Sequence, residues 1–142
     1  MRLRLDKVVR IVAPGVKRVY SLVLTDDGLY LIQTGHAGVL RHYRRDDNRR
    51  LVIDRPDDHS VKDLQANESR IDTTPLDELA KIKDNYFIRL EALEDVELRP
   101  RKNEPEMWIG VTGSEHHLFF PFAREEEVQA FQRALSKWLA PR

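Results

Sequence analysis

The residues best suited to recognising a ligand lie in one short stretch, Arg41–Arg50. Its five arginines and two aspartates give a local charge of +3. A guanidinium group binds phosphate or carboxylate through two parallel hydrogen bonds, and a tyrosine can stack on a base or pack on a partner. The stretch therefore predicts a site for an anionic group, formed by Arg41, Tyr43, Arg44, Arg45, Arg49 and Arg50. The alternative is a solvated loop in which these arginines pair with nearby aspartates.

The spacing of the histidines in the sequence predicts no metal site. None of the five has a ligand spacing on a single expected element, and adjacent side chains on a strand point to opposite faces. A loop could still bring His36 or His42 beside a carboxylate. The five histidines are His36, His42, His59, His116 and His117.

No catalytic motif accompanies these residues. The sequence contains neither the G-x-S-x-G of a serine hydrolase nor a phosphate-binding P-loop, and Gly35–Gly38 is too short for a dinucleotide fingerprint. Acidic residues at positions 91, 94 and 97 lie across a turn and on an outer strand face, where solvated charges are expected. We expect no enzymatic activity, no metal and no cofactor. An enzyme would need a pocket that places His36, His42 or His59 beside a carboxylate.

Alternating apolar and polar residues predict strands at both ends of the chain. The first third contains three such segments, with a turn at Pro14-Gly15 and a hairpin signal at Asp27-Gly28, where glycine accepts the positive φ of a tight turn. The expected strands are Leu3–Val12, Arg18–Leu24, Leu29–Gln33, Phe87–Arg101, Glu106–Thr112 and His117–Phe122.

Arg124–Leu139 has a helical period instead. Glutamates at positions 125–127 suit its first turn, because the helix dipole favours carboxylates there. One stripe is apolar and predicts the face that covers an open end of the sheet. The stripe consists of Val128, Phe131, Leu135, Trp138 and Leu139.

Residues 35–84 lack strand alternation and are rich in Arg, Asp and Asn. We expect an insertion between the two halves of the sheet: a loop or helix, an extended stretch at Leu51–Ile53, then one or two short helices. Thr74 is a candidate N-cap with Pro75 as the first helical residue. An earlier helix is indicated by the spacing of Val61, Leu64, Glu68 and Ile71.

Composition sets further bounds. A chain of 142 residues with 41% hydrophobic residues fits one domain over residues 1–142. Lys+Arg and Asp+Glu number 24 each, and a formal charge of zero argues against a protein that coats nucleic acid. Without cysteine there is no disulfide or thiolate chemistry. The N-terminal apolar run is too short and too charged for a signal peptide or membrane span, so we expect a cytoplasmic protein with no transmembrane segment.

Three segments carry a family resemblance: Tyr20–Gly35, which contains a hairpin of the form T-x-x-x-L-Y, Asn85–Leu98, and the closing Phe122–Leu139. With them the chain resembles a pleckstrin-homology-like (PH-like) domain, in particular the compact bacterial members of that superfamily. The resemblance implies a mainly β fold (α+β by content), in which a bent, seven-stranded antiparallel sheet forms a partly open barrel. It also implies that the C-terminal helix caps one end and that residues 35–84 are a divergent insertion.

The resemblance implies no particular activity, because this scaffold hosts lipid binders, peptide binders and interaction modules. The family's phosphoinositide motif is a run of basic residues around the first hairpin. Its nearest equivalents here, as alternative headgroup contacts, are Lys7, Arg10, Lys17 and Arg18.

We therefore expect a non-enzymatic binding module for a protein partner or for self-association. The alternative is peripheral association with anionic lipids through the basic residues of Arg41–Arg50. Two other surfaces can serve a partner: an exposed sheet edge that accepts an added strand, and an outward Trp108, because tryptophan is enriched at binding hot spots. The alternative for Trp108, equally weighted, is that the insertion covers it.

Overall fold

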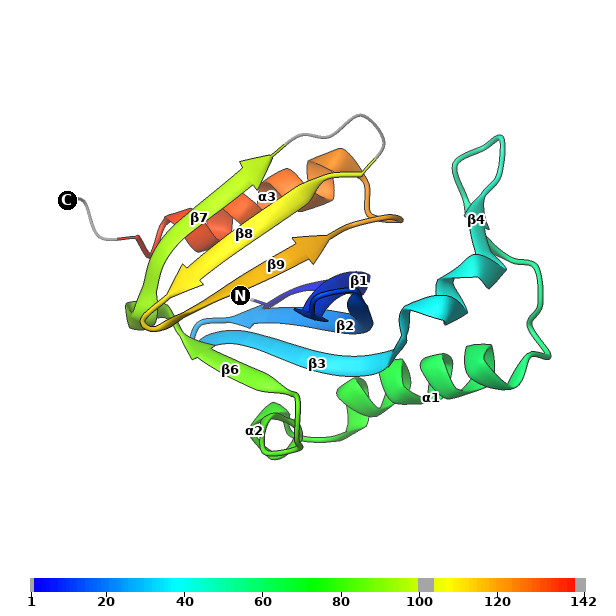
Figure 1. The fold of residues 1–142 in the computed structure, drawn as a ribbon, viewed down its shortest axis with the longest axis horizontal. Helices are drawn as coiled ribbons and strands as arrows, with labels where there is room; N and C mark the ends of the chain where they lie inside the picture. Colours follow the sequence, from blue (N-terminus) through cyan, green and yellow to red (C-terminus); the bar gives the residue numbers. More distant parts are fainter. Residues whose placement is uncertain (1, 100–103, 140–142) are drawn as a thin grey trace.

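Seven antiparallel strands form one bent sheet in the order β6-β3-β2-β1-β9-β8-β7 in the computed structural model, which describes residues 2–99 and 104–139 (Figure 1). The first and last strands of the chain, β1 and β9, are neighbours at its centre. The sheet strands are β1 (Arg2–Ala13), β2 (Val16–Thr25), β3 (Gly28–His36), β6 (Tyr86–Arg89), β7 (Leu93–Arg99), β8 (Glu106–Val111) and β9 (Ser114–Phe119).

The remaining elements follow β3 and β6 or end the chain. The insertion contains the 3-10 helix η1 (Ala37–His42), the two-stranded hairpin β4 (Tyr43–Arg45) and β5 (Leu51–Ile53), and the helices α1 (His59–Thr73) and α2 (Leu76–Ala80). A short 3-10 turn, η2 (Leu90–Ala92), separates β6 from β7, and the chain closes with α3 (Glu125–Ser136). This arrangement confirms the predicted mainly β class, the seven-stranded antiparallel sheet and the C-terminal helix.

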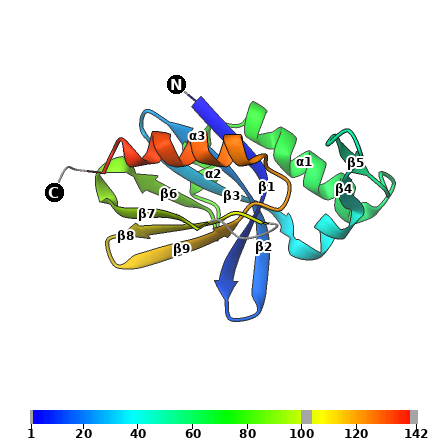
Figure 2. The ribbon, with the colours of Figure 1, turned by 90° about the horizontal axis from the view of Figure 1, so that it is seen from above.

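The inner face of the sheet and α3 enclose the main core. Tyr20, Leu22 and Leu24 share the inner face of β2 as their alternation predicts, and all three are fully buried. Helix α3 packs Val128, Phe131 and Leu135 onto this core. Figure 2 shows α3 along one side of the sheet and the β1–β2 turn on the opposite side.

The prediction that Trp138 belongs to the buried apolar stripe of α3 is wrong. The helix ends at Ser136 with Lys137 as its C-cap, so Trp138 lies beyond the helix and is 44% exposed. Ala134, which the stripe omitted, is buried instead. Leu139 also follows the helix, but it is partly buried and still packs against the core as predicted.

The outer face of β2 and β3 is buried as well, because the insertion covers it. Val23, Tyr30 and Ile32 pack there against Ile71 of α1 and Leu79 of α2. A neighbouring cluster joins β2 to η1, β4 and α1 through Val19, Val39, Tyr43, Val61 and Leu64. The four positions whose spacing predicted a helix, Val61, Leu64, Glu68 and Ile71, are the buried residues of α1.

Helix α1 is also held by charge on β1. A β-bulge between Leu5 and Val8 places Lys7 at φ 56°, and its amine lies 3.1 Å from a carboxylate oxygen of Glu68. Arg4 donates to the backbone carbonyl of Glu68 and to Asp72, both at 2.8 Å. Burial raises the pKa of Glu68 despite the attraction of Lys7, so this pair fixes position more than it adds stability.

Several local predictions need correction. Thr74 is the C-cap of α1 and not an N-cap, and Pro75 is the N-cap of α2 and not its first helical residue. Helix α1 begins after its N-cap Asp58, whose side chain accepts from the Ser60 amide at 3.0 Å. Phe87–Arg101 is not one strand: β6, η2 and β7 divide it, and Pro100 and Arg101 lie outside the described residues. The last strand begins at Ser114, earlier than predicted.

Gly28 is required by contact and not by a positive φ. It begins β3, and a Cβ there would lie 2.4 Å from the carbonyl oxygen of Ile88 on β6. The positive-φ glycines are Gly15 in the β1–β2 turn and Gly113 in the β8–β9 turn. Across residues 2–99 and 104–139, no helix has the length and apolar character needed to cross a bilayer.

The packing of α3 leads to a stability prediction. Phe131→Ala should lower the free energy of unfolding by about 3–5 kcal/mol, because it opens a cavity in the core. Trp138→Ala, a matched aromatic deletion at an exposed site, should change it by less than about 0.5 kcal/mol. Urea unfolding measures both, and equal losses would contradict this position of α3.

Candidate binding surfaces

The predicted anion site at Arg41–Arg50 is divided by the structure. Tyr43 is buried on β4 beside Phe122, so it presents no face to a ligand. Arg44 pairs with Asp54 across the β4–β5 hairpin at 2.8 Å, as the solvated-loop alternative predicted. Arg45 is exposed, and its guanidinium donates to the backbone carbonyls of Arg49 and Phe122. These three residues therefore serve the insertion itself.

The turn between β4 and β5 is held by hydrogen bonds to one aspartate. Asp46 organises the turn by accepting from the backbone amides of Asn48 and Arg50 at 2.9 and 2.8 Å. Arg49, which follows at φ 60°, and Arg50 are exposed, as is Arg41 on η1. In Figure 1 this hairpin stands apart from the seven-stranded sheet.

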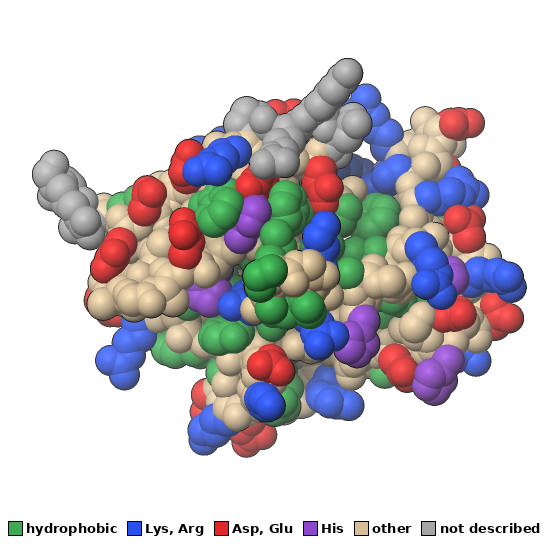
Figure 3. All heavy atoms as spheres, viewed as in Figure 1, with side chains coloured by type: hydrophobic (Ala, Val, Ile, Leu, Met, Phe, Trp, Pro, Cys, Tyr) green, Lys and Arg blue, Asp and Glu red, His purple; other side chains and the backbone are tan. Residues whose placement is uncertain are grey.

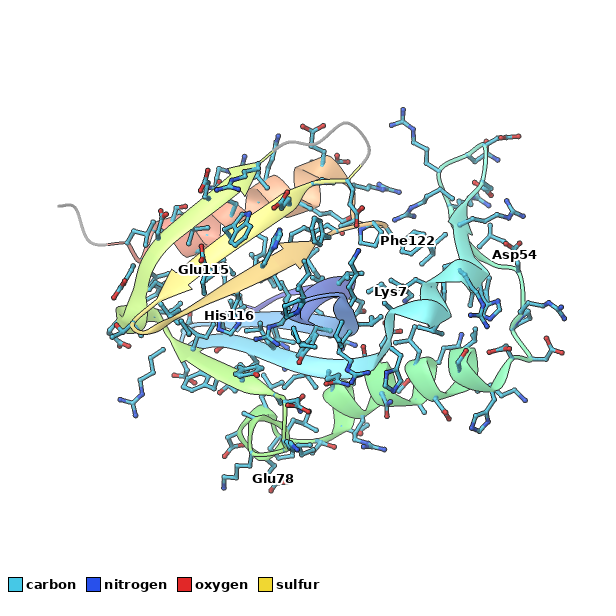
Figure 4. The ribbon with its side chains drawn as sticks, viewed as in Figure 1. Lys7, Asp54, Glu78, Glu115, His116 and Phe122 are labelled. Atoms are coloured by element: carbon cyan, nitrogen blue, oxygen red, sulfur yellow. The ribbon has the colours of Figure 1, made fainter. Side chains whose placement is uncertain are left out.

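The four alternative headgroup contacts are dispersed. Lys7 is engaged with Glu68 and lies with Phe122 between the sheet and the insertion (Figure 4). Lys17 is exposed on β2 with its amine 5.7 Å from the centre of the Phe119 ring, and Arg18 contacts His36. Arg10 points to the inner side of the sheet and is only 8% exposed.

Arg10 is the centre of a polar cluster at the end of the core away from α3. Its Nε donates to Nδ1 of His116 at 3.2 Å, and its Nη1 to the hydroxyl of Tyr20 at 3.4 Å. The guanidinium carbon lies 4.4 Å from the centre of the Tyr86 ring and 5.4 Å from that of Tyr20. The Tyr20 hydroxyl in turn donates to the Asp84 carbonyl at 2.7 Å. The cluster joins β1, β2, β6 and β9 through hydrogen bonds and ring contacts.

His116 and His117 divide between the two faces of β9, as their adjacency predicted. His116 is 4% exposed on the inner side, and burial, with a smaller contribution from Arg10, lowers its pKa to about 4. Its Nδ1 accepts from Arg10, which places the proton of the neutral ring on Nε2. His117 lies on the outer side, stacked on Trp108 with ring centres 3.7 Å apart.

The outer face of β8 and β9 carries a row of rings. His117 contacts Phe119 at 4.5 Å between ring centres and pairs with the fully buried Glu106, which also accepts from the Trp108 indole at 2.6 Å. Arg99 on β7 lies 5.0 Å from the Trp108 ring. Trp108 was predicted to point outward; its stacking on His117 and its bond to Glu106 were not, although the i, i+2 spacing of Glu106 and Trp108 indicates a shared face.

Apolar side chains continue from this face to the β1–β2 turn. Val12 and Val16 flank that turn and are 37% and 38% exposed. In Figure 3 hydrophobic side chains gather over β8, β9 and the protruding turn, with basic and histidine side chains beside them. We call Trp108, His117, Phe119, Val12 and Val16 the aromatic face. The insertion covers the outer face of β2 and β3 and leaves this one unoccupied by α1 and α2.

The other histidines lie beside carboxylates on the insertion. His42 lies 3.6 Å from Asp58, and the exposed His59 lies 3.2 Å from Asp63 one helical turn later. Across the described ranges, no group of three or more histidine or acidic side chains is placed to hold a metal ion.

A groove of about 580 Å³ lies between β3, α1 and α2. Its walls are mostly polar, and two asparagines bond the strand: Asn85 accepts from the Gln33 amide at 2.8 Å, and Asn67 donates to the Thr34 carbonyl at 2.9 Å. These side-chain amides take the place of a neighbouring strand beyond β6. This part of β3, beyond its pairing with β6, is therefore already satisfied at these two groups.

Comparison with known proteins assigns no family to this arrangement: no protein-family model and no curated protein matches the chain.

The burial of His116 predicts a pH dependence of stability. Unfolded, the imidazole titrates near 6.5, whereas folded it titrates near 4, so only the unfolded chain binds the proton between these values. The contribution is complete above pH 6.5 and is lost as the pH falls toward 4, by up to about 3 kcal/mol. His116→Gln should flatten this decline in urea unfolding, whereas His59→Gln, at an exposed site, should leave it unchanged. An NMR titration that gives His116 a pKa near 6.5 would contradict the assignment.

Proposed function

We propose that this chain is a PH-like interaction module that binds a protein partner, or a second copy of itself, through the aromatic face. The PH-like part of the proposal is supported by the strand order, in which the last strand pairs with the first, and by a C-terminal helix over one end of a bent sheet. The insertion between β3 and β6 agrees with the same resemblance.

The observation that carries the binding proposal is the aromatic face itself. Rings on a sheet face bury large areas at low cost in side-chain entropy, and tryptophan and arginine dominate binding hot spots. Here the rings are held rigid before any partner binds, because Trp108 is fixed by His117 and Glu106. Arg99 and Lys17 add cations beside the rings. The exposed apolar tip at Val12 and Val16 extends the area.

Loss of one ring should weaken binding. Trp108→Ala should reduce retention of a partner, or the dimerisation constant, by at least about 30-fold, since a hot-spot residue contributes about 2 kcal/mol or more. Ile82→Ala is the matched control, because Ile82 is 50% exposed on the opposite, insertion side. Light scattering after gel filtration measures self-association, and capture from lysate followed by titration of the captured protein measures a partner.

Thermal melts must show that both variants remain folded. A strictly monomeric chain that retains no protein, or retention that is equal in wild type and Trp108→Ala, would contradict the proposal. The alternative, association with anionic lipid, retains Arg41, Arg49 and Arg50 as exposed contacts. Sedimentation with phosphatidylserine vesicles at low salt is the second arm, and binding that is abolished by replacing these three with Gln would favour that alternative.

A further inference from the structure

The guanidinium of Arg10 has no anionic partner within the described part of the chain. Its hydrogen-bond acceptors are His116 and Tyr20, both uncharged at neutral pH, and its remaining contacts are the faces of Tyr20 and Tyr86. By contrast, Lys7 and Arg44 each pair with a carboxylate. Burying a cation without a counter-charge costs free energy of folding. Such a group therefore indicates a binding site for an anionic ligand.

The geometry leaves Arg10 able to accept an anion. A guanidinium has five donors, and the two hydrogen bonds to His116 and Tyr20 use one on Nε and one on Nη1. Nη2 donates to no residue in the described ranges, and the residue keeps 8% of its surface exposed. The free donors therefore form a fork that suits a carboxylate.

The surroundings of Arg10 favour a protein carboxylate over a free ion. The β1–β2 turn, with Val12 and Val16, lies three residues along the chain from Arg10. Phe119 pairs with Val9, the residue before Arg10, and belongs to the outer face of the sheet. The exposed apolar neighbours of Arg10 along β1 and β2 are therefore Val12 and Val16. The nearby Asp84 offers its backbone carbonyl to Tyr20 and forms no ion pair with Arg10, and the Glu115 carboxylate acts on Arg99 at the outer face.

We infer that Arg10 binds the carboxylate of an aspartate or glutamate in the protein partner, flanked by apolar residues that pack on Val12 and Val16. This inference rests on the proposed function and specifies the partner's chemistry. The carboxylate pairs with Nη2 and the free Nη1 proton, and His116 and the tyrosines hold the guanidinium in place. Binding supplies the counter-charge that the fold itself omits.

The test uses the full chain and two short peptides as probes, acetyl-Leu-Asp-Leu-amide and its neutral twin acetyl-Leu-Asn-Leu-amide. The Nε–H resonance of Arg10, assigned by its absence in Arg10→Gln, is followed by NMR together with the His116 ring. We expect saturable shifts with the aspartyl peptide at an affinity at least about tenfold above that of the asparaginyl peptide. Lys62→Gln, which removes an exposed cation on α1 on the insertion side, should leave these shifts in place.

Equal shifts with both peptides, or no shift at either site, would overturn the inference. Shifts with inorganic phosphate but not with the aspartyl peptide would also overturn it and assign the site to a phosphorylated ligand. Wild-type comparison of the two peptides decides the matter even if Arg10→Gln does not fold. If the peptides fail this test while capture of a partner still depends on Trp108, the inference that Arg10 binds a carboxylate is refuted and the proposed function stands.

Discussion

Strands β2 and β3 are apolar on both faces, and the rest of the structure follows from this constraint. The inner face needs α3 and the β7–β9 half of the sheet to complete its core, whereas the outer face needs α1 and α2. A sheet with one face exposed to solvent would need only the cover of its inner face. The insertion is therefore part of the fold, and the bulge at Lys7 directs an amine out of β1 to hold α1 through Glu68.

This asymmetric cover also decides where binding can occur. Once the insertion occupies the outer face of β2 and β3, and α3 one end of the core, the uncovered surfaces are the aromatic face and the neighbouring end around Arg10. Both carry features that folding alone does not require: rings held rigid by His117 and Glu106, and a cation without a counter-charge. Both lie beside β9: Arg10 contacts His116 on its inner face, and His117 on its outer face belongs to the aromatic face.

Periodicity predicted what depends on local pattern. The inner face of β2, the four buried positions of α1 and the opposite faces of His116 and His117 all follow from spacings of two or of three to four residues. Features set by distant contacts were not predictable in this way. Arg10 resembles any surface arginine until β6 and β9 enclose it, Gly28 is required by the approach of Ile88, and Trp138 is exposed because α3 ends before it.

Hydrogen exchange of individual amides tests the central claim, that the insertion folds as one cooperative unit with the sheet. If it does, the amides of Leu64 and Ile71 in α1 exchange with the same free energy as that of Leu22 in β2, through global unfolding. Exchange of the α1 amides at a free energy at least about 3 kcal/mol below that of Leu22 would contradict it. The insertion would then be a detachable cover, and the outer face of β2 and β3 a further surface for binding.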